Sequence, residues 1–423
     1  MRRHEVRPRK GWREAVEGQG LTYAVDRVEN GDERPYWHEA AAYEFSEEEV
    51  EYLEGVTEEL HAMALEAAWR MVDDPEVMGR LGLPAAAAEL MRAGMSEADP
   101  LTLYGRFDLA YGGSEVGPAK LLEYNADTPA GLVEAAVTQW YWLEDVAPER
   151  DQWNMLHERL VQVWKEAKPR VPEWVVHFAV GAAEPNEDWA TVAYLRDTAR
   201  EAGLIDLGVT MEEIGWHREK RAFVDATGLP IKTCFKMYPW EWMVKEDFGR
   251  HVLDGSSSTT WIEPIWKALL GSKALMPILW EMFPGHENLL PAYFDGPNGM
   301  DRYVAKPMFG WEGAGIRVVL DGDEVAARPE GHAAGQERIY QRFAYLPDFD
   351  GNHPVLGTWI VGGYAAGLGI RESDGLVTDT DARFVPHFMD APRSTPEQVA
   401  AWLADGAGER EGSRNKDAGG DKR

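Results

Sequence analysis

The succession of hydrophobic patterns along the chain is what most constrains its fold. Residues 46–72 place apolar side chains at helical spacing behind Ser46, a good N-cap residue that is followed by three glutamates. Residues 84–94 carry a second helical pattern. From residue 300 onward, short strand patterns separated by glycine-rich or Asp/Pro-rich turns dominate instead. We therefore expect an α+β fold with a helical N-terminal part.

The middle of the chain mixes the two patterns. Residues 101–112 and 119–127 are strand-like and are joined by a glycine-containing turn, which predicts a hairpin, and a helical pattern follows at 132–146. A buried-strand pattern at 174–181 is followed by a helical pattern at 187–203 that ends at a glycine. This alternation continues to about residue 230 and favours a mixed α/β core.

The net charge of the chain limits which classes of molecule it can bind. The chain has 43 lysines and arginines against 73 aspartates and glutamates, a formal net charge of −30. Such a field repels nucleic acid backbones and attracts a small cation. We therefore expect no nucleic-acid partner. An acidic surface that serves solubility alone would have the same composition.

Cysteine content and hydropathy limit which kinds of site and which cellular locations the chain can have. Cys234 is the single cysteine, which excludes an internal disulfide and a cysteine-rich metal site. The basic N-terminus lacks the apolar segment of a secretory signal, and the apolar run at 274–283 is too short to span a bilayer. We expect a cytoplasmic protein with no membrane partner. Residues 404–423 have almost no bulky apolar side chain and are expected to form a disordered tail.

Four polar residues alternate with apolar ones in the predicted hairpin. Arg106 and Asp108 share one face of the first strand, and Glu123 and Asn125 share one face of the second. If the strands pair, these side chains converge. Two carboxylates and an amide oxygen suit Mg²⁺, and an arginine beside them suits a phosphate. The polar outer face of an ordinary hairpin would give the same alternation.

Two lysines lie in settings that suit a nucleotide. Lys273 is flanked by hydrophobic residues, and Lys306 ends a strand pattern just before a loop that contains Gly310, Gly313 and Gly315. Cations neutralise phosphates, and a glycine-rich backbone can close over them. A P-loop motif is absent from the sequence, so any nucleotide site is of another kind. Taken singly, a lysine in such a setting is more often a snorkelling side chain beside a turn than a phosphate ligand.

Together these segments resemble the synthetase part of glutathionylspermidine synthase, and still more its stand-alone bacterial relatives. The resemblance covers roughly residues 1–395. It is carried by long aromatic-rich words in the same order: LLEYNADTPAGLVEAAVTQWYWLE, MYPWEWM, WIEPIWKALLGSKALMPILWEMFP, YVAKPMFGWEGAGI, IYQRFAYLPDFDGNHPVLGTWIVGG and AAGLGIRES. It implies an ATP-grasp fold in a permuted order, with metal ligands ahead of the ATP lysines. It also implies that Asp108, Glu123 and Asn125 bind Mg²⁺.

The resemblance also implies roles around ATP. Arg106 would lie at the transferred phosphate, and Lys273 and Lys306 would hold ATP phosphates and adenine-side groups. Gln341, in the word IYQRF, would lie near the adenine. Arg371, which follows a glycine-rich strand pattern, would stabilise the transferring phosphate and an acyl-phosphate, although a lone arginine at such a place is usually a surface residue.

Two departures from the family pattern stand out. The family's loop commonly reads KPxxGRxGxNI, and here Trp311 replaces the arginine and Gly315 the asparagine. Loop closure or substrate contact is therefore expected to differ. The N-terminal Cys-dependent amidase of the bifunctional relatives is absent, so amide hydrolysis is not expected.

The expected activity is an ATP- and Mg²⁺-dependent ligation of a carboxylate to an amine. The γ-phosphoryl group moves to the carboxylate, and the amine attacks the acyl-phosphate. The amine must lose a proton, for which Glu212, Glu213 and Asp225 are among many candidates. Expected substrates are glutathione or a related peptide and a polyamine, with another acid–amine pair as the alternative.

Two other classes of function fit the sequence less well. A nucleotide-binding protein without turnover would not need the complete set of arginines, lysines and acidic residues. A carbohydrate-binding or hydrolytic protein would use the 18 tryptophans, but most of them fall inside apolar runs and are expected in the core. The sequence does not identify the two substrates or the oligomeric state.

Overall fold

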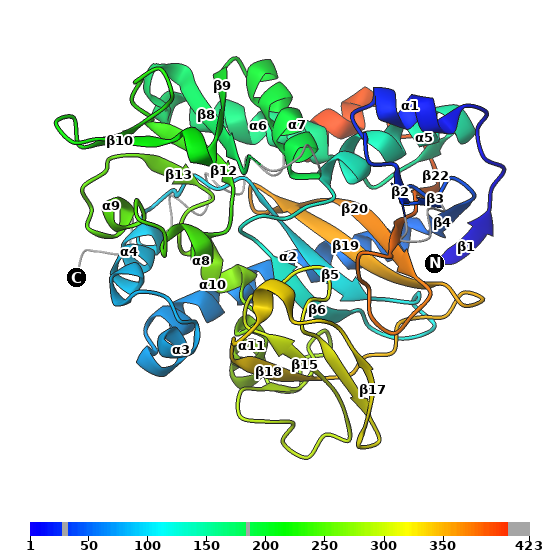
Figure 1. The fold of residues 1–423 in the computed structure, drawn as a ribbon. Helices are drawn as coiled ribbons and strands as arrows, with labels where there is room; N and C mark the ends of the chain where they lie inside the picture. The colour runs from blue at the N-terminus through cyan, green and yellow to red at the C-terminus, as the bar shows by residue number, and fades with distance from the viewer. Residues whose placement is uncertain (28–32, 183–186, 405–423) are drawn as a thin grey trace, which may run out of the picture.

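The fold is a mixed α/β arrangement, seen in a computed structural model that describes residues 1–27, 33–182 and 187–404 (Figure 1). Its central sheet is antiparallel and has the strand order β21-β20-β19-β5-β6. In chain order its strands are β5 (Tyr104–Ala110), β6 (Lys120–Asn125), β19 (His353–Val361), β20 (Tyr364–Ser373) and β21 (Arg383–Phe384). In Figure 1 this sheet lies between two others, one above it and one below it.

One face of the central sheet is apolar because the long helix α2 (Glu47–Val72) covers it. Apolar residues of the helix share one core cluster with Phe107, Leu109, Leu356 and Ile370 of the strands. Ser46 caps the helix through a capping box with Glu49, as the sequence predicts. The opposite face of the sheet is left to carry polar side chains.

The sheet above the central one is parallel, with the order β13-β12-β8-β9. Its strands are β8 (Val175–Val180), β9 (Ile205–Thr210), β12 (Thr233–Met237) and β13 (Thr260–Ile262). Helices α6 (Leu156–Ala167) and α7 (Glu187–Glu201) pack near it (Figure 1). The carboxyl ends of parallel strands share one edge, where ligands commonly bind.

The sheet below is antiparallel, with the order β14-β18-β15-β16-β17. Its strands are β14 (Ala292–Tyr293), β15 (Arg302–Pro307), β16 (Arg317–Leu320), β17 (Asp323–Ala327) and β18 (Arg338–Arg342). Helices α10 (Lys267–Gly271) and α11 (Leu275–Met282) connect the parallel sheet to this one. The dominance of strands after residue 300 is confirmed.

The N-terminal segment differs from the prediction. The expected helices are present as α2, α3 (Pro75–Arg80) and α4 (Ala85–Met95), but the segment before them is not predominantly helical. Its described residues, 1–27 and 33–45, form β1 (Arg2–Glu5), the pair β2 (Val25–Arg27) and β3 (Glu33–Pro35), β4 (Ala41–Phe45) and one short helix, α1 (Trp12–Gly18). β1 and β4 join β22 (His387–Pro392) and β7 (Arg150–Asp151) in a fourth sheet. β4 is extended because it pairs with β22 and β1, and no local sequence pattern reveals a pairing between segments so far apart in the chain.

The remaining elements are short. They are α5 (Gln139–Val146), α8 (Trp240–Met243), α9 (Arg250–Leu253), the pair β10 (Gly215–His217) and β11 (Ala222–Val224), and 3₁₀ turns at 168–170, 172–174, 211–213 and 331–333. The helix expected at 132–146 begins as a π-helical turn, Glu134–Thr138, before α5. None of the helices in the described ranges has the length and apolar content needed to cross a bilayer. Residues 405–423, nearly all of the predicted tail, lie outside the described residues.

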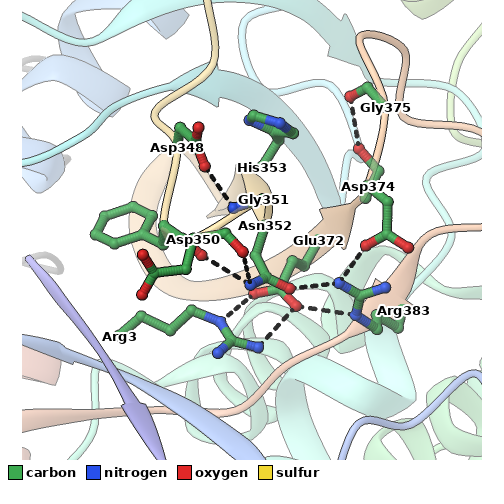
Figure 2. A network of polar contacts seen from close by, with 12 residues as sticks. Arg3, Asp348, Asp350, Gly351, Asn352, His353, Glu372, Asp374, Gly375 and Arg383 are labelled. Atoms are coloured by element: carbon green, nitrogen blue, oxygen red, sulfur yellow. Dashed lines mark hydrogen bonds and ion pairs between the residues drawn. The ribbon is translucent and has the colours of Figure 1, made fainter.

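A buried carboxylate joins β1 to the central sheet (Figure 2). Glu372 of β20 accepts hydrogen bonds from Arg3 Nε at 2.7 Å, Arg383 Nε at 2.9 Å and the Tyr43 hydroxyl at 2.6 Å. Burial by itself would raise the pKa of Glu372, but these donors, Arg3 foremost, lower it below the usual value. The network fixes the strand segment beside residue 371.

We predict that Glu372→Ala lowers the free energy of unfolding by about 3–5 kcal/mol, because it leaves two arginines without their buried counter-charge. Urea unfolding measures the loss. Asp374 is the matched control, since it binds the same Arg383 at 2.7 Å but its side chain is 77% exposed. Asp374→Ala should cost no more than about 1 kcal/mol. Equal losses in the two variants would contradict the prediction.

Candidate active site

The polar face of the central sheet holds the four residues of the predicted hairpin. β5 and β6 pair antiparallel, with Arg106 opposite Asn125 and Asp108 opposite Glu123. The amide nitrogen of Asn125 is 3.2 Å from Glu123 Oε1 and 3.5 Å from Asp108 Oδ2. The expected convergence of these side chains is therefore present.

Two glycines of the central sheet make room for the long side chains on this face. Gly357 of β19 lies opposite both Asp108 and Gly369. A Cβ atom on Gly357 would lie 2.9 Å from Cδ of Arg106, and one on Gly369 would lie 2.8 Å from the Phe384 ring. Side chains at these positions would displace the arginine or the ring. The glycine-rich strand pattern thus serves the packing of the polar face.

Arg371 and Arg106 meet at Asp108. Arg371 lies within β20, not after it as the sequence pattern suggested, and its Nη2 is 2.8 Å from Asp108 Oδ2. Arg106 binds the same carboxylate through Nε at 2.7 Å and Nη2 at 3.2 Å. A third donor atom of Arg106, Nη1, binds the carbonyl of Ala130. Segments more than 260 residues apart thereby bring two guanidinium groups to one carboxylate.

The two lysines converge on Glu123. Lys273 Nζ lies 3.3 Å from Glu123 Oε2, and Lys306 Nζ donates to the carbonyl of Leu122 at 2.9 Å. Burial alone would raise the pKa of Glu123, but Lys273, Lys306 and Arg371 hold it down at about 2. Burial lowers the pKa of Lys306 to about 8, although Glu123 opposes this shift. Four cations and two carboxylates thus occupy one buried patch.

The glycine-rich loop lies over this patch. Lys273 Nζ donates to the carbonyl of Gly310 at 2.6 Å. Gly313 has φ +72°, and a Cβ there would lie 3.3 Å from Val377. Trp311 stacks on His332 with ring centroids 3.6 Å apart. An aromatic stack therefore holds the loop at this position.

A small cavity of about 110 Å³ opens beside the lysines. Its walls include Lys306, Gln341 and an apolar set from the lower sheet, the neighbouring loops and strand β19 of the central sheet: Val304, Ile316, Val318, Phe343, Leu346 and Val355. Gln341 Nε2 donates to the carbonyl of Leu121 at 3.1 Å. Apolar walls with a few polar groups suit a flat heteroaromatic ring.

A large cavity of about 1130 Å³ lies on the other side of the loop. It is lined by Arg106, Glu123, Asn125, Trp311 and Arg371, and by residues that sequence reasoning missed: Tyr23, Tyr36, Glu187, Asp188 and Glu241. Glu187 and Asp188 begin α7 behind β8. The one available signal was their place after a predicted buried strand, because ligands commonly bind where such a strand leads into a helix.

The missed carboxyl groups are poorly solvated. Burial raises the pKa of Glu187 to about 8, with the charge of Glu134 adding to the rise. Burial likewise raises the pKa of Glu241 to about 7 and that of Asp188 to about 6. These groups change protonation state near neutral pH, which suits proton transfer.

The carboxylates that the sequence offered as candidates for taking the proton of the amine form hydrogen bonds with loop and turn residues instead. Glu212 accepts the backbone N–H of Ala182 at 2.9 Å, and Glu213 completes a capping box with Thr210. Asp225 accepts from Thr227 and Leu229 within its own turn. These three residues are not among those that line the large cavity. The sequence could not choose among its many carboxylates, because sequence position does not reveal which strand edge faces the cavity.

The donor set suits a hard divalent cation. Within the described residues, no cluster of three or more His, Cys, Asp or Glu side chains could hold a metal ion, and the set here is two carboxylates with one amide. Glu123 is ionised at neutral pH, and the Asn125 amide bridges the two carboxylates. Turning that amide over would present its oxygen in place of its nitrogen. Two carboxylates, an amide oxygen and phosphate oxygens are ligands that Mg²⁺ accepts.

Comparison with known proteins decides the family. The pattern of the family described as glutathionylspermidine synthase preATP-grasp matches residues 3–390. The chain belongs to the glutathionylspermidine synthase family. A Haemophilus influenzae relative, named only provisionally as an acid–amine ligase, is 37% identical over 370 residues, which is 85% of this chain and 92% of the relative.

More distant members of the family are larger. The trypanothione synthetase of Crithidia fasciculata is 26% identical over 77% of this chain and 53% of its own length. The bifunctional glutathionylspermidine synthetase/amidase of Escherichia coli is 26% identical over 81% and 58%. The chain thus spans just over half of each. Because the chain belongs to this family and its relatives are named as synthetases and ligases, it is an ATP-dependent enzyme that forms carbon–nitrogen bonds.

A solved structure supports the fold alone. The apo structure of a glutathione synthetase-like effector from Globodera pallida matches with a TM-score of 0.55 at 9% identity, over 90% of this chain and 96% of the effector.

Proposed function

We propose that this enzyme activates a carboxylate with Mg·ATP and joins it to an amine through an acyl-phosphate. The observation that carries the proposal is the convergence of Arg106, Arg371, Lys273 and Lys306 around Asp108 and Glu123. Phosphoryl transfer needs positioning and charge neutralisation more than covalent help from the protein. Residues 1–395 would act as one ligase unit with the ATP-grasp elements in permuted order.

ATP would lie between the central and lower sheets. The small cavity with Gln341 would take the adenine, and Lys306 and Lys273 would face the phosphates under Gly310 and Gly313. Mg²⁺ would be held by Asp108, Glu123 and Asn125, and would supply charge neutralisation on the phosphate oxygens. Without ligand the four cations of the patch outnumber its two carboxylates, so bound phosphates would supply further negative charge and would draw the arginines and lysines toward themselves.

The large cavity would hold the acid and the amine. Its Glu187, Asp188 and Glu241 favour a substrate that enters as a cation. Glutathione or a related peptide with a polyamine fits this charge, and so does another acid with a cationic amine. The relative named as an acid–amine ligase supports the general reaction and not a given pair. Amide hydrolysis finds no support, because Cys234 is buried and burial raises the pKa of its thiol.

The deciding experiment is phosphate release from Mg·ATP in a matrix of carboxylates against amines. Release that requires one acid and one amine together supports the ligase. Thermal stabilisation by Mg·ATP without release under any combination would favour a nucleotide-binding protein without turnover.

We predict that residues 309–315 become protected when Mg·ATP binds. Their glycines allow the backbone to move, and phosphates give the backbone amides a partner. Hydrogen exchange of the peptide that covers the loop should slow at least severalfold with Mg·ATP, while a peptide from α2 stays unchanged. Equal exchange with and without the nucleotide would contradict the prediction.

A further inference from the structure

A buried carboxylate behind the wall of the large cavity has no role in the reaction described so far. Glu134 is fully buried, and its Oε1 accepts hydrogen bonds from the Tyr36 hydroxyl at 2.7 Å and the Tyr23 hydroxyl at 3.1 Å. Its Oε2 is buried and has no hydrogen-bond partner among the described residues. Burying a carboxylate oxygen without a hydrogen-bond partner costs free energy, so the unpartnered Oε2 of Glu134 needs a physical explanation.

Glu134 stands at an irregular point of the backbone. It opens the π-helical turn Glu134–Thr138, a conformation that is rare and often found at functional sites. The turn starts three residues after Gly131, whose carbonyl accepts the N–H of Ala135 at 3.2 Å. This places Glu134 one turn from the loop that binds Arg106 through Ala130.

Glu187 reaches the same point from another part of the fold. A Cβ on Gly131 would lie 3.6 Å from Arg106 Nη1 and 3.9 Å from Glu187 Oε1. Gly131 has φ +84°, so the close approach and the backbone both favour glycine there. The carboxylate of Glu187 therefore lies close to Arg106 of the phosphate patch and to Gly131, three residues before Glu134.

We infer that Glu134 and Glu187 form a carboxylate pair, in which Glu187 takes the proton of the attacking ammonium and Glu134, held by Tyr23 and Tyr36, keeps Glu187 basic. This inference rests on the proposed ligase reaction and deepens it. Glu187 is the catalytic residue of the pair because it lines the cavity. Glu134 is a positioning residue that acts through Glu187.

The charges around Glu187 are consistent with Glu187 as the proton acceptor and Glu134 as the group that keeps it basic. Burial raises its pKa most, Glu134 and Asp188 raise it further, and Arg106 and Arg371 oppose the rise. Burial raises the pKa of Glu134, and the hydrogen bonds from Tyr36 and Tyr23 oppose that rise by favouring its ionised form. Whenever Glu134 is ionised, a second negative charge on Glu187 is unfavourable, so Glu187 binds a proton more strongly.

The step balances without an outside reactant. The ammonium gives one proton to the Glu187 carboxylate, and the freed electron pair of the amine attacks the acyl carbon. A carbon–nitrogen bond forms, and the carbon–oxygen bond to phosphate breaks as inorganic phosphate leaves. The second proton of the nitrogen passes to solvent or phosphate.

The test compares two nucleophiles on the acid that the phosphate-release screen selects. Hydroxylamine is uncharged at neutral pH and needs no base, whereas an alkyl ammonium does. Glu187→Gln should lower ligation of the alkyl ammonium by about 10²–10⁴-fold, the range for a lost general base, and leave hydroxamate formation nearly unchanged. Equal losses with both nucleophiles would overturn the role of Glu187. Absence of hydroxamate in the wild type would instead overturn the proposed acyl-phosphate.

The role of Glu134 is tested by pH. The alkaline-rising limb of ligation should have its midpoint near the Glu187 pKa, and Glu134→Gln should move it down by about one pH unit, the scale of a nearby like charge. Tyr23→Phe with Tyr36→Phe should move it the same way, because Glu134 then stays protonated over a wider range. Glu324→Gln on the exposed strand β17 is the control, since Glu324 is not among the residues that line the cavity, and it should leave the midpoint unmoved. An unmoved midpoint in Glu134→Gln would overturn the pairing.

A substrate-free measurement tests the same pairing. A raised carboxyl pKa means that the folded chain binds the proton more tightly than the unfolded chain. Stability from this group is therefore present at low pH and is lost as pH rises from the ordinary value of 4.5 to about 8. Thermal melting of the full chain should show this loss ending at a lower pH in Glu134→Gln. Superimposable pH curves for the wild type and the variant would also overturn the pairing.

Discussion

Arg371→Ala is expected to lower ligation by about three to five powers of ten while Mg·ATP still binds, judging from other arginines that act in phosphoryl transfer. The side chain lies 2.8 Å from Asp108 and lines both cavities, so it can follow the transferring phosphate. A group that acts mainly on the developing charge affects turnover more than ground-state affinity. Asp108 keeps its two contacts to Arg106 in the variant, so the local fold should persist.

Phosphate release measures turnover in Arg371→Ala, and the thermal shift with Mg·ATP measures binding. Arg302→Ala is the control, because Arg302 forms an exposed pair with Asp321 on the lower sheet. It should change neither quantity beyond experimental error. Normal turnover in Arg371→Ala on the selected acid and amine would show that the geometry is present without the proposed role.

Glu123→Gln is expected to reduce turnover by about 10²–10³-fold, the effect of losing one well-placed electrostatic group. It removes a proposed ligand of Mg²⁺ and the counter-charge of Lys273 and Lys306 while keeping the shape of the side chain. At a nucleotide concentration of about 100 times Kd, the wild type should gain about 2.7 kcal/mol of stability from Mg·ATP, and the variant should gain almost none. EDTA should abolish the gain in the wild type.

The same variant has a signature in pH without ligand. The pKa of Glu123 is depressed to about 2, so its contribution to stability is present above the ordinary value of 4.5 and is lost as pH falls toward 2. The Glu123→Gln protein should therefore lose less stability than the wild type in that interval. Glu324→Gln on the exposed strand β17 is the control and should follow the wild type. Wild-type turnover and an unchanged acid profile in Glu123→Gln would reject the assignment.

Local sequence patterns determined much of the polar face. Arg106 and Asp108 are two residues apart, as are Glu123 and Asn125, and the pleat of a strand sends such pairs to one side. The turn between the two strands is short, so their pairing follows from chain connectivity. Helix α2 was equally predictable, because its N-cap residue and its apolar residues at helical spacing all lie within one continuous segment, 46–72.

Only the tertiary structure decided which distant side chains complete the site. Glu134, Glu187 and the two tyrosines come from a π-helical turn, the start of α7 and the N-terminal segment, and no spacing relates them. The candidates Glu212, Glu213 and Asp225 were as plausible by composition, yet in the fold they accept hydrogen bonds from backbone N–H groups of loops and turns, and none of the three lines the large cavity. The physical reason is that proximity within a strand or helix follows from a fixed backbone period. Proximity between elements depends instead on which sheet edges and helix ends the packed core brings together.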